Sequence, residues 1–404
     1  MRALLGLGRQ ARLEARDLPA HAALEPAAQA LLEMGHRQVA IIAGPATSQD
    51  NVARVSSFLA EMKRQGVDPR GIPVVESDFS PEGGLASAKK LLQEGHKFTA
   101  VFCANDEMAV GALACLAERG LRVPQDVSVI GYDDTLTAEF AVPLLNGGAR
   151  VIDLSADFRL KSAATYKEFY AHDHPAPELL AKSVYGLPEV HRAAIQGAML
   201  VASPGCYPTS ILLPTLPLLR AGLIKPQGII ADSMSGVSGA GRKAELDYLF
   251  VECNESVRPY GVPKHRHLSE IEEQLALAAG GPVTIQFTPH LIPVNRGILT
   301  TLYLAPARHF KSAEETAALG AQIAACYQAA YADEPFVRGL EGKGLPDTKN
   351  VVGTNVLELA WRLDPRTGRL LVMSAEDNIV KGASGQAVQS FNVMFGFPGA
   401  AGLF

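Results

Sequence analysis

Long apolar runs, basic clusters and paired cysteines are all missing from this chain of 404 residues, and each absence excludes a class of protein. No apolar run reaches the roughly 18 residues that suggest a membrane span. A net charge of −5 and the lack of a long basic run argue against nucleic acid as a partner. The five cysteines are odd in number, widely spaced and without metal-ligand spacing, which fits a reducing cytoplasm better than a disulfide framework. We therefore expect a cytoplasmic protein with no metal and no nucleic-acid or membrane partner.

The chain changes character near residue 145. Before that point, apolar runs typical of buried strands alternate with helical patterns; the strands fall at 38–43, 72–75, 99–102 and 127–130. Such alternation predicts an α/β part with a parallel, doubly wound, Rossmann-like sheet. Later strand patterns surround a long helical pattern, with strands at 283–287, 298–304, 356–361 and 370–373 and the helix at 313–331. The second part is therefore predicted to be an α+β catalytic domain with a mixed sheet, and we expect it to form a homo-oligomer.

One cysteine, Cys206, lies where a strand turns into a helix. The apolar run 198–202 precedes it, and the helical pattern 211–219 follows in spite of Pro214 and Pro217. The free N–H groups and the macrodipole at a helix N-terminus favour a thiolate and lower the pKa of a thiol there. Cys206 is therefore a candidate nucleophile, although a single cysteine is often only a small buried apolar residue.

Two histidines about sixty residues later offer this cysteine a base. His265 is the first candidate and His267 the second, because side chains two apart in an extended segment point the same way. Glu270 lies one helical turn further on and is placed to orient an imidazole. The alternatives are a surface His-x-His loop, an adventitious metal site and a plain solvated glutamate.

Seven motifs in one order, spanning about 145–404, closely resemble the N-acetyl-gamma-glutamyl-phosphate reductase family. They lie at 151–159, 185–189, 204–208, 235–242, 265–267, 293–297 and 377–387. The resemblance implies that Cys206 attacks the acyl phosphate of N-acetyl-glutamyl phosphate and expels phosphate, giving a thioester. NADP is the implied cofactor, since in that family NADPH delivers hydride to the thioester carbon and the semialdehyde leaves.

The resemblance also implies binding residues. Arg296 is the candidate for the substrate carboxylate and Arg242 for its phosphate, because the planar guanidinium matches such anions with two bonds. An ordinary surface ion pair is the alternative for Arg296. With these arginines, Glu270 completes the predicted substrate site. The predicted cofactor-binding residues are Ser155, Arg159, Asn378, Lys381, Gly382, Ser384 and Gly385. For the two glycines, a tight loop without cofactor is the alternative.

A second resemblance covers about 24–144. The segments 33–40, 103–111 and 126–134 look like the effector-binding domain of LacI/GalR-type regulators. That likeness implies Arg54, Asp106 and Asp133 as contacts of a small-molecule effector, often a sugar. Three departures weaken the implication: the helix-turn-helix headpiece is missing, most of the first effector subdomain is missing, and Ser57 replaces a usual glycine. Asp106 is better explained as a helix N-terminal residue.

The reductase-like part also lacks a piece, since no glycine-rich dinucleotide turn immediately precedes Val151. The sequence at 6–11 does spell G-x-G-x-x-A, but neither a convincing preceding strand nor an acidic second strand accompanies it. The predicted domains are 1–23 without assignment, 24–144 regulator-like, 145–206 a remnant of the dinucleotide domain, 207–378 catalytic, and 379–404 a helix returning to the dinucleotide domain. Three functions remain open: the reductase, a ligand-binding module and an inactive fusion.

Overall fold

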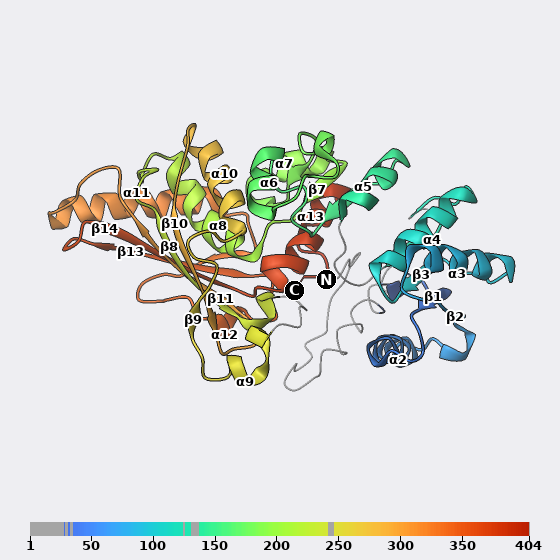
Figure 1. Ribbon diagram of the computed structural model, residues 1–404. Helices are drawn as coiled ribbons and strands as arrows, with labels where there is room; N and C mark the ends of the chain where they lie inside the picture. The colour runs from blue at the N-terminus through green and yellow to red at the C-terminus, as the bar shows by residue number, and fades with distance from the viewer. Residues whose placement is uncertain are drawn as a thin grey trace. The chain divides into compact units, whose positions relative to one another are not determined.

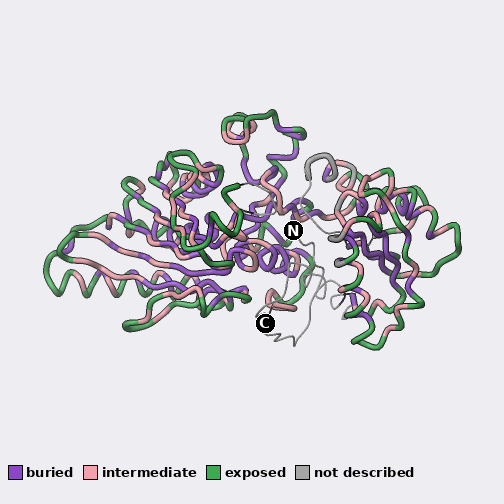
Figure 2. Tube along the Cα trace, turned by 60° about the horizontal axis from the view of Figure 1, so that its bottom comes forward, coloured by how far each residue is buried: buried purple, intermediate pink, exposed green. Residues whose placement is uncertain are grey.

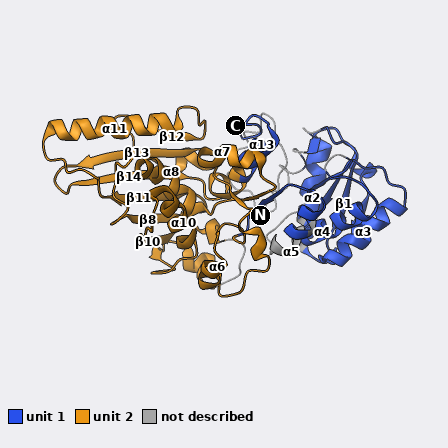
Figure 3. Cartoon of the chain, turned by 90° about the horizontal axis from the view of Figure 1, so that it is seen from above, with its two compact units in different colours: residues 1–155, 387–404 blue, residues 156–386 orange. Residues whose placement is uncertain are grey.

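The computed structural model describes residues 28, 31–32, 35–123, 126–130, 137–240 and 246–403. The chain forms two compact units, which we call unit 1 (1–155 with 387–404) and unit 2 (156–386) (Figures 1 and 3). Three predicted features lie outside the described residues: the glycine motif at 6–11, Asp133 and Arg242. Within the described residues, no helix is long and apolar enough to cross a membrane.

Unit 1 contains a four-stranded parallel sheet in the order β2-β1-β3-β4. Every residue of β1 and β3 is buried, as expected for parallel strands covered on both faces (Figure 2). On one face Phe102 stacks on Phe58 of α2, with ring centroids 4.4 Å apart, and on the other Val101 packs with Leu91 of α3. This arrangement confirms the predicted parallel, doubly wound fold. The elements of unit 1 are β1 Val39–Ala43, α2 Gln49–Arg64, η2 Pro69–Gly71, β2 Val74–Glu76, α3 Pro81–Gln93, β3 Ala100–Cys103, α4 Asp106–Glu118, β4 Ser128–Ile130, α5 Thr137–Asn146 and β5 Val151–Asp153.

The C-terminal segment from Ala387 groups with unit 1. It includes most of α13 (Gly385–Phe395). Arg150 Nη1 donates to the carbonyl of Met394 at 2.5 Å, and its guanidinium lies 4.8 Å from the centroid of the Phe395 ring. Contacts with one arginine thus connect this late segment to residues far earlier in the chain.

Unit 2 is built on a seven-stranded mixed sheet in the order β12-β13-β14-β11-β8-β10-β9. Burial alternates along β10 and β11, so the sheet turns one face to the core. Helix α8 packs on β11 and β14, and α10 and α11 pack on α8. The mixed sheet confirms the second half of the predicted fold class. The elements are α6 Ala163–Tyr170, η3 Pro177–Leu179, β6 Val184–Tyr185, α7 Pro188–Gly197, β7 Leu200–Ala202, α8 Cys206–Arg220, β8 Ile230–Gly236, η4 Val237–Ala240, η5 Leu246–Tyr248, α9 Phe250–Cys253, β9 Arg258–Pro259, α10 His267–Ala279, β10 Gln286–Ile292, β11 Ile298–Leu304, α11 Ala313–Tyr331, β12 Val337–Gly339, α12 Thr348–Val351, β13 Leu357–Asp364, β14 Arg369–Glu376 and the π-helical turn η6 Val380–Ser384.

Helix α8 continues through two prolines because its neighbours satisfy the carbonyls that the prolines leave free. Proline has no N–H, so Pro214 and Pro217 each remove the helical hydrogen bond to the carbonyl four residues earlier. Ser374 Oγ donates to the carbonyl of Ser210 at 2.7 Å, and the Tyr331 hydroxyl donates to that of Leu213 at 2.5 Å. The buried helix therefore depends on hydroxyl groups from β14 and α11.

Replacing Tyr331 by Phe is expected to lower the free energy of unfolding by about 1–3 kcal/mol, because the buried Leu213 carbonyl loses its donor. Tyr303→Phe is the matched control, since Tyr303 is 38% exposed on β11. Chemical denaturation of the two variants measures the difference. Equal stability of both variants would contradict this account of α8.

Candidate active site

Cys206 is the first residue of α8, directly after the turn 203–205 that follows β7. Gly205 precedes the helix as its N-cap residue. A Cβ atom at Gly205 would lie 2.7 Å from Nε2 of His267 and 2.8 Å from Oε1 of Glu270. Only glycine therefore allows the main chain to approach both side chains so closely.

A row of buried hydroxyl groups fixes the start of α8 on the sheet. Ser210 Oγ lies 2.8 Å from Thr300 Oγ1 of β11, which lies 2.8 Å from Ser233 Oγ of β8. Because these groups are buried and hydrogen-bonded, they hold the first turns of α8 at a defined distance from the strands. They thereby help to fix the position of Cys206 at the start of the helix.

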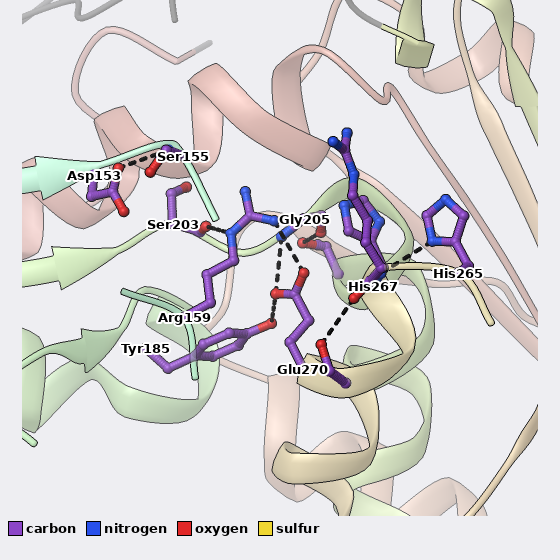
Figure 4. A network of polar contacts seen from close by, with 12 residues as sticks. Asp153, Ser155, Arg159, Tyr185, Ser203, Gly205, His265, His267 and Glu270 are labelled. Carbon is purple, nitrogen blue, oxygen red and sulfur yellow. Dashed lines mark hydrogen bonds and ion pairs between the residues drawn. The ribbon is translucent and has the colours of Figure 1, made fainter. Parts of the chain in front are cut away.

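Glu270 is the centre of a buried polar network beside the turn (Figure 4). Its carboxylate pairs with Arg159 Nη1 at 3.0 Å and accepts hydrogen bonds from the Tyr185 hydroxyl at 2.9 Å and from Gly205 N at 3.3 Å. Arg159 also donates from Nε to the carbonyl of Ser203 at 2.8 Å. The network therefore binds both sides of the turn that presents Cys206. Glu270 and Arg159 thus both position this turn. That Glu270 orients an imidazole and that Arg159 binds the cofactor stay predictions.

Both predicted histidines lie beside Cys206 in the same cavity. Their ring centroids are 4.9 Å apart, and both rings pack edgewise on Tyr207. Burial lowers the pKa of His265 to about 4 and holds the pKa of His267 well below its usual value, so both imidazoles are neutral at pH 7.

The two imidazoles differ in which nitrogen is available. The main-chain N–H of His267 donates to Nδ1 of His265 at 3.1 Å, so neutral His265 carries its proton on Nε2. Nδ1 of His267 is buried and has no hydrogen-bond partner among the described residues. His265 is therefore arranged as a donor, whereas His267 keeps a free ring nitrogen.

The predicted low pKa of the Cys206 thiol is wrong for the structure as it stands. Burial and the nearby carboxylate of Glu376 raise the pKa to about 12, against the main-chain N–H of Tyr207 and the positive charges of Arg159 and Arg266. The helix N-terminus is present, but desolvation of the sulfur outweighs it. Cys206 is consequently a thiol at neutral pH until something else stabilises its anion.

A cavity of about 410 Å³ opens beside Cys206. Three cationic side chains line it: Arg258, Lys264 and Arg266. Arg258 pairs with Asp247 at 3.8 Å and Lys264 with Glu168 at 2.9 Å, while exposed Arg266 has no ion pair among the described residues. The cavity therefore suits an anionic ligand. None of these cations was predicted from the sequence to have a role; the position of Arg266 between the two histidines was the available signal.

The other predicted binding residues lie apart from this lining. Arg296 does not line the cavity and approaches Asp377, with its Nε 3.4 Å from Oδ2. Asn378 accepts from Gly297 N at 2.7 Å and donates to Ser238 Oγ at 2.9 Å. Lys381 is fully buried, with Nζ 2.6 Å from Oε1 of Glu189 and 2.7 Å from Oε1 of Gln386. Each of the three residues is thus held by hydrogen bonds or an ion pair to other residues of the chain.

The turn η6 brings glycine against the cysteine. Its i→i−5 hydrogen bonds run from Gly382 N to the Asp377 carbonyl, from Ser384 N to the Ile379 carbonyl and from Gly385 N to the Val380 carbonyl. A Cβ atom at Gly382 would lie 2.6 Å from Cβ of Cys206, and one at Gly385 would lie 2.3 Å from Oδ1 of Asn355. Both glycines are thus required by close packing. Such π turns often occur at functional sites.

The β–α turns that follow β1, β2 and β3 of unit 1 do not fit the pyrophosphate of a dinucleotide. A Cβ atom at Gly44, directly after β1, would lie 2.2 Å from the Phe79 ring, so that ring fills the space a phosphate needs. Gly44 N already donates to Asn51 Oδ1 at 2.6 Å. Side chains also cap the following helices: Ser48 caps α2, Ser80 caps α3 and Asn105 caps α4. Ser155, the predicted cofactor residue of unit 1, donates its N–H to Asp153 Oδ1 at 2.7 Å.

The predicted effector residues are only partly described. Buried Arg54 directs Nη1 to the carbonyl of Ala104 at 2.7 Å. Asp106 begins α4, whose N-cap is Asn105, in line with the helix N-terminal alternative. No described contact of these residues favours an effector site over a structural one. Among the described residues, no group of three His, Cys, Asp or Glu side chains is placed to hold a metal ion.

Unit 2 is similar to the semialdehyde dehydrogenases in sequence and fold. Residues 206–378 match the family model of the semialdehyde dehydrogenase dimerisation domain. Aspartate semialdehyde dehydrogenase II from Vibrio cholerae has the same fold at 16% identity, with a TM-score of 0.50 over 88% of this chain and 98% of that one.

The particular family follows from sequence identity. The chain is 54% identical to the N-acetyl-gamma-glutamyl-phosphate reductase of Akkermansia muciniphila over 280 residues, which are 69% of this chain and 78% of that protein. The chain belongs to the N-acetyl-gamma-glutamyl-phosphate reductase family, as the sequence predicted. It is therefore an oxidoreductase of a type that is generally dinucleotide-dependent.

The second predicted resemblance is also confirmed. Residues 28–146 match the family model of a periplasmic binding protein-like domain. A LacI-family transcriptional regulator from Burkhoderia phymatum is 51% identical over 31% of this chain and 46% of that one, with a TM-score of 0.30. Sequence segments similar to two families thus lie in one chain.

Gly382→Ala is expected to lower the free energy of unfolding by about 1–3 kcal/mol, because the new methyl group overlaps Cβ of Cys206. Gly197→Ala is the control, since a Cβ atom there meets nothing within 4 Å. Chemical denaturation of both variants measures the difference. Equal stability of the two variants would show that close packing against the cysteine does not require glycine at position 382.

Proposed function

We propose that the chain acts on N-acetyl-glutamyl 5-phosphate in arginine biosynthesis and reduces it to N-acetyl-glutamate 5-semialdehyde through a thioester on Cys206. The observation that supports this proposal is the position of Cys206. It is the first residue of α8 and lines a cavity together with two neutral imidazoles and three cationic side chains. An acyl phosphate has an electrophilic carbonyl, which the cysteine can attack, and an anionic leaving group, which the cations can bind.

The first step is attack by the Cys206 sulfur on the acyl carbon. We assign the thiol proton to His267, whose Nδ1 is unpaired, and an N–H donor role to Nε2 of His265. The carbon–sulfur bond forms and the carbon–oxygen bond to phosphate breaks, so inorganic phosphate leaves with the electron pair. Arg258, Lys264 and Arg266 line the cavity that receives its charge. Arg296, which does not line the cavity, and Arg242, which lies outside the described residues, remain candidates for substrate anions.

We propose NADPH as the cofactor, which when bound would supply the hydride that reduces the thioester. The described β–α turns of unit 1 do not accommodate its pyrophosphate, so the steps derived from this chain's residues end at the thioester. The dimerisation domain that residues 206–378 match supports a homo-oligomer, and we place the enzyme in the cytoplasm as the cysteine usage suggests.

Mixing the protein with N-acetyl-glutamyl phosphate in the absence of NADPH is expected to release about one phosphate per Cys206 in a burst, which Cys206→Ser abolishes. Cys326→Ser, which changes a half-buried cysteine on α11, is the control and should keep the burst. A full burst in Cys206→Ser would contradict the nucleophile. Titration of NADPH fluorescence then tests the donor separately: saturation supports it, and no binding by folded protein contradicts it.

A further inference from the structure

Glu376, the last residue of β14, is an unexplained acid in the core of unit 2. The residue is fully buried, and neither carboxylate oxygen has a hydrogen-bond partner among the described residues. An ionised carboxylate without partners is unfavourable in such surroundings, and burial raises the pKa of Glu376 well above its usual value. Burial therefore favours the protonated form of Glu376.

This acid lies next to Cys206, with only Gly382 between them. A Cβ atom at Gly382 would lie 2.6 Å from Cβ of Cys206 and 3.1 Å from Oε1 of Glu376. The thiol and the carboxyl group thus flank the same α-carbon of η6. Because Gly382 packs closely against both groups, the charge of one group acts strongly on the other.

The other charged groups near this pair do not neutralise Glu376 directly. Lys381 lowers the pKa of Glu376, but its Nζ pairs with Glu189 at 2.6 Å, and no ion pair of Glu376 is found among the described residues. Asp377 and Glu189 act in the opposite direction and raise that pKa. Arg159 and Arg266 act on the side of Cys206. The pair is therefore two acids sharing one buried place, where at most one negative charge is stable.

We propose that Glu376 controls the reactivity of Cys206: the thiolate forms while Glu376 holds its proton, and an ionised Glu376 keeps the thiol protonated. Glu376 is a positioning residue in this sense, since it acts through the cysteine. The inference rests on Cys206 being the nucleophile of the proposed function. In this proposal the thiolate of Cys206 depends on Glu376 being uncharged as well as on the helix N-terminus.

The test is the pH dependence of Cys206 alkylation by iodoacetamide, followed by mass spectrometry of its peptide. Glu376→Gln cannot ionise, so its alkylation rate should match the wild type at pH values where Glu376 is protonated and exceed it above the pKa of Glu376, by about tenfold for each unit by which the pKa of Cys206 falls. Glu358→Gln is the control: Glu358 is also buried, but it lies on β13 and pairs with Arg338. An unchanged pKa of Cys206 in Glu376→Gln, or slower alkylation, overturns the proposal.

The wild-type protein gives a second measurement that needs no folded variant. Two coupled acids predict an alkylation profile with two steps, whereas an uncoupled thiol predicts a single ionisation curve. A single curve overturns the proposal even when Glu376→Gln does not fold. The readout requires neither NADPH nor substrate, so loss of turnover with a two-step profile would fault the proposed function and leave the role of Glu376 standing. No alkylation of Cys206 at any pH would overturn both.

Discussion

The buried ion pair between Arg159 and Glu270 is the interaction on which the rest of the site depends. It binds the turn before Cys206 from both sides, through the carbonyl of Ser203 and the N–H of Gly205. Removing one partner of such a pair leaves an uncompensated buried charge, which costs about 3–5 kcal/mol. The cysteine, the glycine beside it and the imidazole of His267 are placed relative to this pair.

The sequence predicts what local patterns determine and misses what distant segments supply. Alternating apolar runs reveal both sheets, and the helix after Cys206 is visible despite its prolines. The hydroxyl of Tyr331 and that of Ser374, which make this helix possible, come from segments that no local pattern connects to it. The pKa of Cys206 was predicted in the wrong direction for the same reason, since its burial and Glu376 lie outside the local strand–helix pattern.

The two halves of the chain differ in how completely they retain the features of their families. Unit 2 contains the cysteine, the histidines and the mixed sheet of a semialdehyde dehydrogenase. Unit 1 has parallel strands, as a dinucleotide domain does, but Phe79 and Asn51 occupy the turn where a phosphate would approach. A similar sheet is thus insufficient for cofactor binding, because the phosphate site depends on the turn and not on the strands.

The most direct test of the account is a double-mutant cycle on the central pair, with the free energy of unfolding as the readout. Arg159→Met and Glu270→Gln are each expected to lower the free energy of unfolding by about 3–5 kcal/mol, and the double variant should lose less than the sum of the two, because both changes remove one interaction. Additive effects of the two substitutions would contradict the claim that Arg159 and Glu270 act together to position the cysteine.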